Sequence, residues 1–210
     1  MSEVIVDISM SLDGYVAGPG QSEEHPLGAG GEQLHEWAFA TSAWLERHGR
    51  EGGDTGPDDA LVRGLGERVG AEIMGRGKFG GGPGPWDESW QGWWGDEPPF
   101  GYPVFVLTHH ERATLTLGDT TFTFVTDGIE SALDQARAAA GGGDVLIGGG
   151  ASTCNQYVAA GLVDELLLHV APVMLGGGER LLVDTGTAEL QPAEVIGSPR
   201  VTHLRYRFRR

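Results

Sequence analysis

Apolar positions along the chain follow two periods, one typical of strands and one typical of helices. A first strand is predicted at 4–9, where Val4, Val6 and Ile8 share one side. Further strands are predicted at 71–74, 104–107, 121–125, 145–147, 165–170, 193–196 and 201–208. Helical spacing of apolar residues predicts helices at 33–48, 58–70, 128–140 and 152–160.

Strands and helices alternate over most of this order, and the last two strands follow each other directly. Alternation predicts an α/β fold with a mainly parallel sheet and helices on both faces. The terminal pair at 193–196 and 201–208 predicts an antiparallel hairpin, which makes the sheet mixed. At 210 residues we expect a single domain over 1–210.

Composition narrows the range of partners. The net charge of −16 opposes binding to nucleic acid and to anionic membranes. No apolar run approaches the roughly 18 residues of a membrane span, and the N-terminus has no basic segment of a signal peptide, so we expect a cytoplasmic protein. The lone cysteine, Cys154, excludes an intrachain disulfide and is interpreted as a small structural residue at a helix start.

The most informative stretch runs from Asp144 to Thr153, DVLIGGGAST. A short buried strand ends on three glycines, and a helix is predicted to follow at once. Such a turn leaves backbone N–H groups and the positive end of the helix dipole facing outward, which suits a phosphate group. A tight structural turn is the alternative interpretation, because the chain holds 36 glycines.

Three further segments of the same kind follow predicted strands. Ser11–Ala17 (SLDGYVA) follows the first strand, Gly75–Lys78 (GRGK) follows 71–74, and Leu107–His109 (LTH) follows 104–107. All could lie at one edge of a parallel sheet, where ligands collect in open α/β folds. The segment 75–101, with four tryptophans and a Gly/Pro-rich run, is predicted to be a long loop that either covers the core or walls a substrate site.

These four motifs, in this order, resemble the dihydrofolate reductase-like superfamily. The chain is most similar to the reductase domain of riboflavin biosynthesis, the C-terminal half of bifunctional deaminase-reductases, and to its stand-alone relatives. The resemblance covers nearly the whole chain, from Val4 to Phe208. It implies a three-layer α/β/α fold, NADPH as cofactor, hydride transfer to a heterocyclic or ribosyl phosphate substrate, and a homodimer.

The resemblance also assigns residues to the cofactor. Gly75 and Arg76 match the turn whose arginine meets the 2′-phosphate of NADPH, with Lys78 as a second cation. The triple glycine matches the pyrophosphate turn, whose glycine pair often carries a cis peptide bond in this superfamily. The full expected set is Ala17, Gly75, Arg76, Lys78, Leu107, Thr108, His109, Gly148, Gly149, Gly150, Ala151, Ser152 and Thr153. No metal is expected.

The proton donor is less clearly indicated. Glu36 is the candidate carboxylate on the first helix and His35 the candidate donor at neutral pH. Asp13 belongs to the loop that closes over the nicotinamide, or serves as an Asx-turn residue. Three functions therefore stay open: a riboflavin-type NADPH reductase, a pterin reductase with Glu36 as its acid, and a nucleotide-binding protein without turnover.

Overall fold

The predicted first strand, β1 (Val4–Ser11), lies inside a nine-stranded sheet in the computed structural model, which describes residues 2–209. The strands lie in the order β10 (Leu190–Gly197), β11 (Thr202–Phe208), β8 (Glu165–Ala171), β1, β7 (Asp144–Ile147), β3 (Val69–Gly75), β4 (Val104–Leu107), β6 (Thr120–Val125) and β5 (Leu115–Leu117). The six strands from β8 to β6 run parallel. The predicted terminal hairpin, β10–β11, joins β8 antiparallel, and β5 ends the sheet antiparallel to β6.

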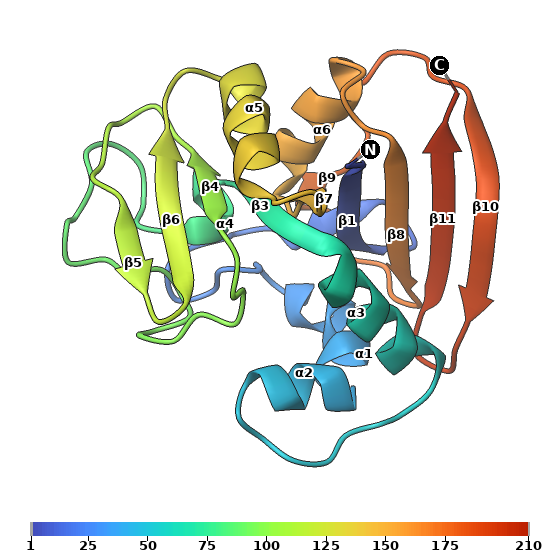
Figure 1. The fold of residues 1–210 in the computed structure, drawn as a ribbon. Helices are drawn as coiled ribbons and strands as arrows, with labels where there is room; N and C mark the ends of the chain where they lie inside the picture. The colour runs from blue at the N-terminus through green and yellow to red at the C-terminus, as the bar shows by residue number, and fades with distance from the viewer. Residues whose placement is uncertain (1, 210) are drawn as a thin grey trace.

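Helices cover both faces of the sheet, as Figure 1 shows. One layer holds α5 (Ile129–Ala139) and α6 (Ala151–Ala159). The other holds η1 (Gly31–Leu34), α1 (Glu36–Phe39), α2 (Ser42–Arg47) and α3 (Pro57–Arg68). The three-layer α/β/α architecture expected from the sequence is therefore confirmed. No helix within residues 2–209 is long and apolar enough to cross a membrane.

One predicted helix is wrong as a single element. The segment 33–48 is divided into η1, α1 and α2, because Thr41 leaves the helical conformation with ψ at 149°. Its Oγ1 accepts a hydrogen bond from the backbone N–H of Trp44 (3.2 Å), which caps α2. Apolar periodicity continues across the break, so the pattern alone does not reveal it.

The segment after β3 also differs from the predicted loop. It begins with one helical turn, α4 (Arg76–Phe79), and only then becomes irregular. Trp86, Trp90 and Trp94 pack on a second core cluster built from Phe79, Phe122 and the side chains around them. The tryptophan-rich loop, residues 80–103, therefore covers the core at the β4–β6 end of the sheet. Two short strands were not predicted: β5, and β9 (Glu179–Arg180), which pairs with β2 (Tyr15–Ala17).

Strand β1 presents different chemistry to the two helical layers. Val4, Val6 and Ile8 belong to the main core beneath α5 and α6. By the alternation of a strand, Asp7 and Ser9 lie on the opposite face, together with Ile5. Ionisable groups therefore enter the interior on the side of α1 and α3.

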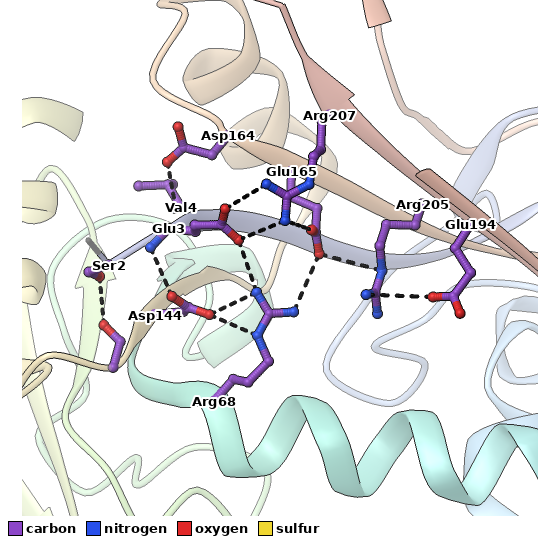
Figure 2. Close-up of polar contacts among 11 residues, drawn as sticks. Ser2, Glu3, Val4, Arg68, Asp144, Asp164, Glu165, Glu194, Arg205 and Arg207 are labelled. Atoms are coloured by element: carbon purple, nitrogen blue, oxygen red, sulfur yellow. Dashed lines mark hydrogen bonds and ion pairs between the residues drawn. The ribbon is translucent and has the colours of Figure 1, made fainter. Parts of the chain in front are cut away.

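Charged side chains gather at the amino ends of β1, β7 and β8 (Figure 2). Arg68, at the end of α3, lies 3.0 Å from Glu3 and 2.9 Å from Asp144. Glu165, which is 1% exposed, lies 3.3 Å from Arg207 and 3.7 Å from Arg68. This network ties α3 and β11 to the end of the sheet opposite to the glycine turns.

Candidate active site

The carboxyl ends of β3 and β7 meet through backbone contacts. The N–H of Gly75 donates to the carbonyl of Gly149 (2.8 Å), and the N–H of Gly148 donates to the carbonyl of Ile73 (3.0 Å). A Cβ atom at Gly75 would lie 2.4 Å from Oγ1 of Thr153, which explains why glycine stands there. The peptide bond between Gly149 and Gly150 is cis. Two of the predicted motifs are thus built against each other.

The amino end of α6 is open toward the outside of this turn. Gly150 is its N-cap and supplies no side-chain cap, and a Cβ atom there would meet nothing within 4 Å. The first N–H groups of a helix have no partner within it, so Ala151, Ser152 and Thr153 present donors beside the turn. An uncapped helix end next to unobstructed backbone fits a pyrophosphate group.

The third motif lies at the end of the adjacent strand. Leu107, the last residue of β4, pairs with Gly75 across the sheet. Thr108 is buried, and its Oγ1 accepts a hydrogen bond from the backbone N–H of His110 (3.2 Å). His109 is exposed. Segments 75–78, 107–109 and 148–153 therefore share one edge of the sheet, as the sequence predicted.

Both cations expected at this edge are engaged by the protein itself. Arg76 donates to the carbonyls of Gly84 (2.6 Å) and Gly81 (3.2 Å), and its guanidinium lies 3.7 Å from the ring centroid of Trp86. Burial, with a smaller effect of Arg112, lowers the pKa of Arg76. Lys78 lies 2.7 Å from Glu72. Contact with a 2′-phosphate requires Arg76 to leave the tryptophan-rich loop, so that role remains a prediction.

The loop after β1 is tied to the loop after β8. Asp13 accepts hydrogen bonds from the backbone N–H groups of Leu175 (3.1 Å) and Gly176 (2.7 Å). A hydrogen bond from Ser11 is the largest effect that lowers the pKa of Asp13, and these amides add to it. An ionised carboxylate holds no proton to donate at neutral pH. Ala17 is buried in the β2–β9 pair. The geometry gives Asp13 a loop-fastening role.

The two candidate acids near the first helix lie in different surroundings. Glu36 is exposed at the start of α1. His35 is half-buried, and burial, followed by the charges of Lys78 and His169, lowers its pKa to about 4. At neutral pH its imidazole is neutral and is a poor acid. Neither residue therefore has the surroundings of an effective proton donor.

Sequence reasoning missed a row of ionisable groups on the α1–α3 side of the sheet. Asp7 contacts Nε2 of His169, and Nδ1 of His169 lies 2.7 Å from Nδ1 of His203. Farther along the row, Tyr102 donates to Glu72 (3.1 Å). We call these five residues, with Lys78, the polar face. The signal was present in the sequence, because Asp7 and His169 interrupt strands that a parallel sheet buries on both faces.

Gly148 lies at the middle of the polar face. A Cβ atom there would lie 2.1 Å from Oε1 of Glu72 and 2.7 Å from Nζ of Lys78. Burial raises the pKa of Tyr102 well above its usual value, so its hydroxyl keeps the proton that it donates to Glu72. The glycine turn therefore contacts the polar face as well as the amino end of α6.

The lone cysteine lies in α6, directly after this turn. Cys154 is buried, and burial raises the pKa of its thiol to about 12, which fits a structural residue. Within residues 2–209, no group of three or more His, Cys, Asp or Glu side chains is arranged to hold a metal ion.

The sheet order, the two helical layers and the turns at the carboxyl edge define an α/β protein of the dihydrofolate reductase-like class. Within that class, the model of the RibD C-terminal domain matches residues 2–204, and the chain belongs to this family. The resemblance stated from the sequence is confirmed.

Solved structures share the fold at low sequence identity. One is a protein assigned provisionally to riboflavin biosynthesis from Shewanella sp. PV-4, with a TM-score of 0.64 at 22% identity over 99% of both chains. A pyrimidine reductase-like protein from Corynebacterium diphtheriae has a TM-score of 0.58 at 16% identity, over 100% of this chain and 92% of that one. The riboflavin biosynthesis reductase Rib7 from Saccharomyces cerevisiae has a TM-score of 0.55 at 13% identity, over 100% of this chain and 89% of that one. No curated protein matches the chain significantly.

Proposed function

We propose that this chain is an NADPH-dependent reductase of the riboflavin-biosynthesis type. Its substrate would be 5-amino-6-(5-phosphoribosylamino)uracil or a related heterocycle that carries a ribosyl phosphate. Family membership supports the reductase class. The observation that carries the cofactor assignment is the contact of Gly75, Gly149 and Thr153 beside the uncapped end of α6.

The chain's own residues have limited tasks in such a reaction. The N–H groups of Ala151, Ser152 and Thr153 would hold the pyrophosphate, and Gly148–Gly150 would let it approach the backbone. Thr108 and His109 would lie beside the adenosine phosphate. The bound dinucleotide supplies the hydride, whereas the protein orients the reactants and excludes water.

Nucleotide binding is the test of this proposal. NADPH and NADH are titrated into the purified protein while the fluorescence of its six tryptophans is followed. We expect NADPH to quench the fluorescence and Arg76→Ala to weaken that binding. Arg50→Ala, a change at an exposed arginine beyond α2, is the matched control and should bind as the parent does. If neither nucleotide binds, the reductase assignment is wrong.

Turnover separates the remaining alternatives. Loss of NADPH absorbance with an aminopyrimidine ribosyl phosphate supports the riboflavin-type reaction, whereas loss only with a dihydropterin supports the pterin alternative. The exposed position of Glu36 gives the pterin alternative no support. Binding of NADPH without consumption on either substrate would identify a nucleotide-binding protein without turnover.

We also propose a homodimer of single-domain chains, as the family resemblance implies. Most of the apolar stretch Leu166–Met174 is buried within one chain, whereas Met174 at its end is 74% exposed. Leu166 and Leu167 are each 1% exposed inside one chain, because β8 lies between β1 and β11. Val195 on the edge strand β10 is also exposed. Sedimentation at micromolar concentration tests the assembly, and a monomer there would exclude it.

A further inference from the structure

A continuous chain of hydrogen bonds crosses three strands of the polar face and ends on a helix. Asp7 on β1 contacts Nε2 of His169 on β8, whose Nδ1 lies 2.7 Å from Nδ1 of His203 on β11. Nε2 of His203 lies 3.0 Å from Oδ1 of Asp58 in the first turn of α3. The two imidazoles are 3% and 1% exposed. Buried contacts of this kind must be satisfied by hydrogens.

Counting those hydrogens fixes the charge of the histidine pair. A carboxylate without a proton only accepts, so with both aspartates in that form His169 and His203 each carry a hydrogen on Nε2. The contact between the two Nδ1 atoms needs one more hydrogen, because two bare nitrogens repel each other. Three hydrogens on two imidazoles make one of them an imidazolium. Between two ionised carboxylates, the pair therefore stores one excess proton.

The surroundings agree with a stored positive charge. The ring of Trp37 lies 4.4 Å from the His169 ring and 4.9 Å from the His203 ring, between centroids, within the range of cation–π attraction. Burial lowers the pKa of His203, and of the two rings His169 is the one in contact with Asp7. The two Nδ1 atoms face each other across one hydrogen, so neither is free for a metal ion.

The two aspartates at the ends of the hydrogen-bond chain lie in different surroundings. Asp7 is partly exposed, with 19% of its side chain accessible, on the face that carries Gly148 and Lys78. Asp58 lies at the outer end, where it also accepts a hydrogen bond from Oγ of Ser198 (2.9 Å). Asp58 fixes the ring of His203, whereas Asp7 is the member of the chain that can reach a substrate beside the glycine turn.

Resting on the proposed function, we propose that the His169–His203 pair, positioned by Asp58, stores the proton that accompanies hydride transfer and that Asp7 relays it to the substrate. Reduction of a polarised C=N or C=O bond adds a hydride to carbon and a proton to the heteroatom while the π bond breaks. The hydride comes from the bound dinucleotide, and the proton passes from His169 through Asp7 to the heteroatom. The pair becomes two neutral imidazoles, and solvent returns one proton after product release.

An isosteric substitution distinguishes storage from simple packing. In Asp58→Asn the amide can donate to Nε2 of His203, so that His203 donates from Nδ1 to His169 and His169 donates to Asp7. Every contact is then satisfied by two neutral rings. The variant keeps the geometry of the hydrogen-bond chain and loses the excess proton. Asp134→Asn, at an exposed acid on α5, is the matched control.

The first readout is nitrogen NMR of the histidine rings in the protein without nucleotide. We expect one imidazolium per pair at neutral pH in the parent and two neutral rings in Asp58→Asn. Groups that face the pair or Asp7 and titrate or carry charge include His35, Lys78, Asp58, Glu72 and Tyr102. The His35 signals are assigned with His35→Gln. If both rings are neutral in the parent protein, the pair does not store a proton and the proposal is wrong.

The second readout is single-turnover reduction. Asp7→Asn should lower the rate about 100-fold, within the range for loss of a general acid, with nucleotide affinity unchanged. Asp58→Asn should lower it at least about tenfold and abolish the fall in rate at high pH that deprotonation of the pair causes. If Asp58→Asn keeps the rate and the pH profile of the parent protein, the proposal is wrong. If the parent reduces no substrate, the proposed function and the relay role of Asp7 both fail, while NMR still decides storage.

Discussion

Substitution of Gly75 by alanine tests the packing of the glycine turn directly. The backbone of Gly75 has φ at −79°, which any residue adopts, so the change introduces no backbone strain. The new methyl group would lie 2.4 Å from Oγ1 of Thr153, against 3.4–4 Å for an ordinary contact. Thr153 is 5% exposed and has little room to move, so the collision should destabilise the protein by about 2 kcal/mol.

The same geometry predicts a rescue. Thr153→Ala removes Oγ1, and the nearest remaining atom, Cβ of Thr153, lies at an acceptable 3.7 Å from the new methyl group. The double variant should therefore regain most of the loss, with a coupling free energy of about 1–2 kcal/mol in a double-mutant cycle. Gly77→Ala is the matched control, because a Cβ atom there meets nothing within 4 Å and α4 gains a better helix former.

Urea unfolding followed by tryptophan fluorescence measures these free energies. We expect the midpoint of thermal unfolding of Gly75→Ala to fall by about 6 °C and that of Gly77→Ala to stay or rise slightly. If Gly75→Ala has the same free energy of unfolding as the parent protein, β3 and α6 are not packed as described. A loss that persists undiminished in the double variant would show that Thr153 is not the obstacle.

Three other predictions follow from buried groups. Cys154 should resist alkylation at pH 8 in the folded protein and react once urea unfolds it, because burial raises the pKa of its thiol to about 12; rapid labelling of the native state would contradict this. Glu165→Gln should cost about 3 kcal/mol of unfolding free energy, since the arginines around it lose a buried counter-charge; a loss below about 1 kcal/mol in urea titrations argues against that network. The pKa of His35 is lowered from 6.5 to about 4, so between these pH values the unfolded chain binds a proton that the native chain does not. The free energy of unfolding should therefore fall as the pH decreases from 6.5 to 4. His35→Gln should show a shallower dependence of this free energy on pH, and the same dependence in both proteins would exclude the effect.

The sequence predicted the sheet and its glycine turns because both depend on local signals. A buried strand of apolar residues, glycine at its end and a helix start are read from neighbouring positions, as at Val145–Thr153. The division of 33–48 depends instead on Thr41, whose bridge partner Asp54 lies beyond the helix. Periodicity carries no information on such a tertiary contact.

The candidate site shows the same limit more sharply. The spacing of Gly75, Arg76 and Lys78 predicts where these residues lie, but the partners of the two cations come from elsewhere: carbonyls of the tryptophan-rich loop and Glu72 on β3. His169 and His203 lie 34 positions apart and meet because β8 and β11 pair in register. The pairing of distant strands, which local sequence patterns do not reveal, decides which ionisable residues become neighbours.

The charge balance of the chain bears on how the proposed cofactor site would attract an anion. Its 14 lysines and arginines compare with 30 acidic residues, and the cations nearest the sheet edge contact other groups of the protein. Arg76 is held by carbonyls, Arg112 is 2% exposed beneath the tryptophan-rich loop, and Lys78 is paired with Glu72. The charged side chains at that edge are therefore engaged within the protein. In the proposed cofactor site, the pyrophosphate would be attracted chiefly by the backbone N–H groups at the start of α6, which carry no net charge and keep their direction in any protonation state, whereas Arg76 would act on the 2′-phosphate. Glycine at 148–150 keeps this backbone accessible, and a side chain at 148 would collide with the Glu72–Lys78 pair.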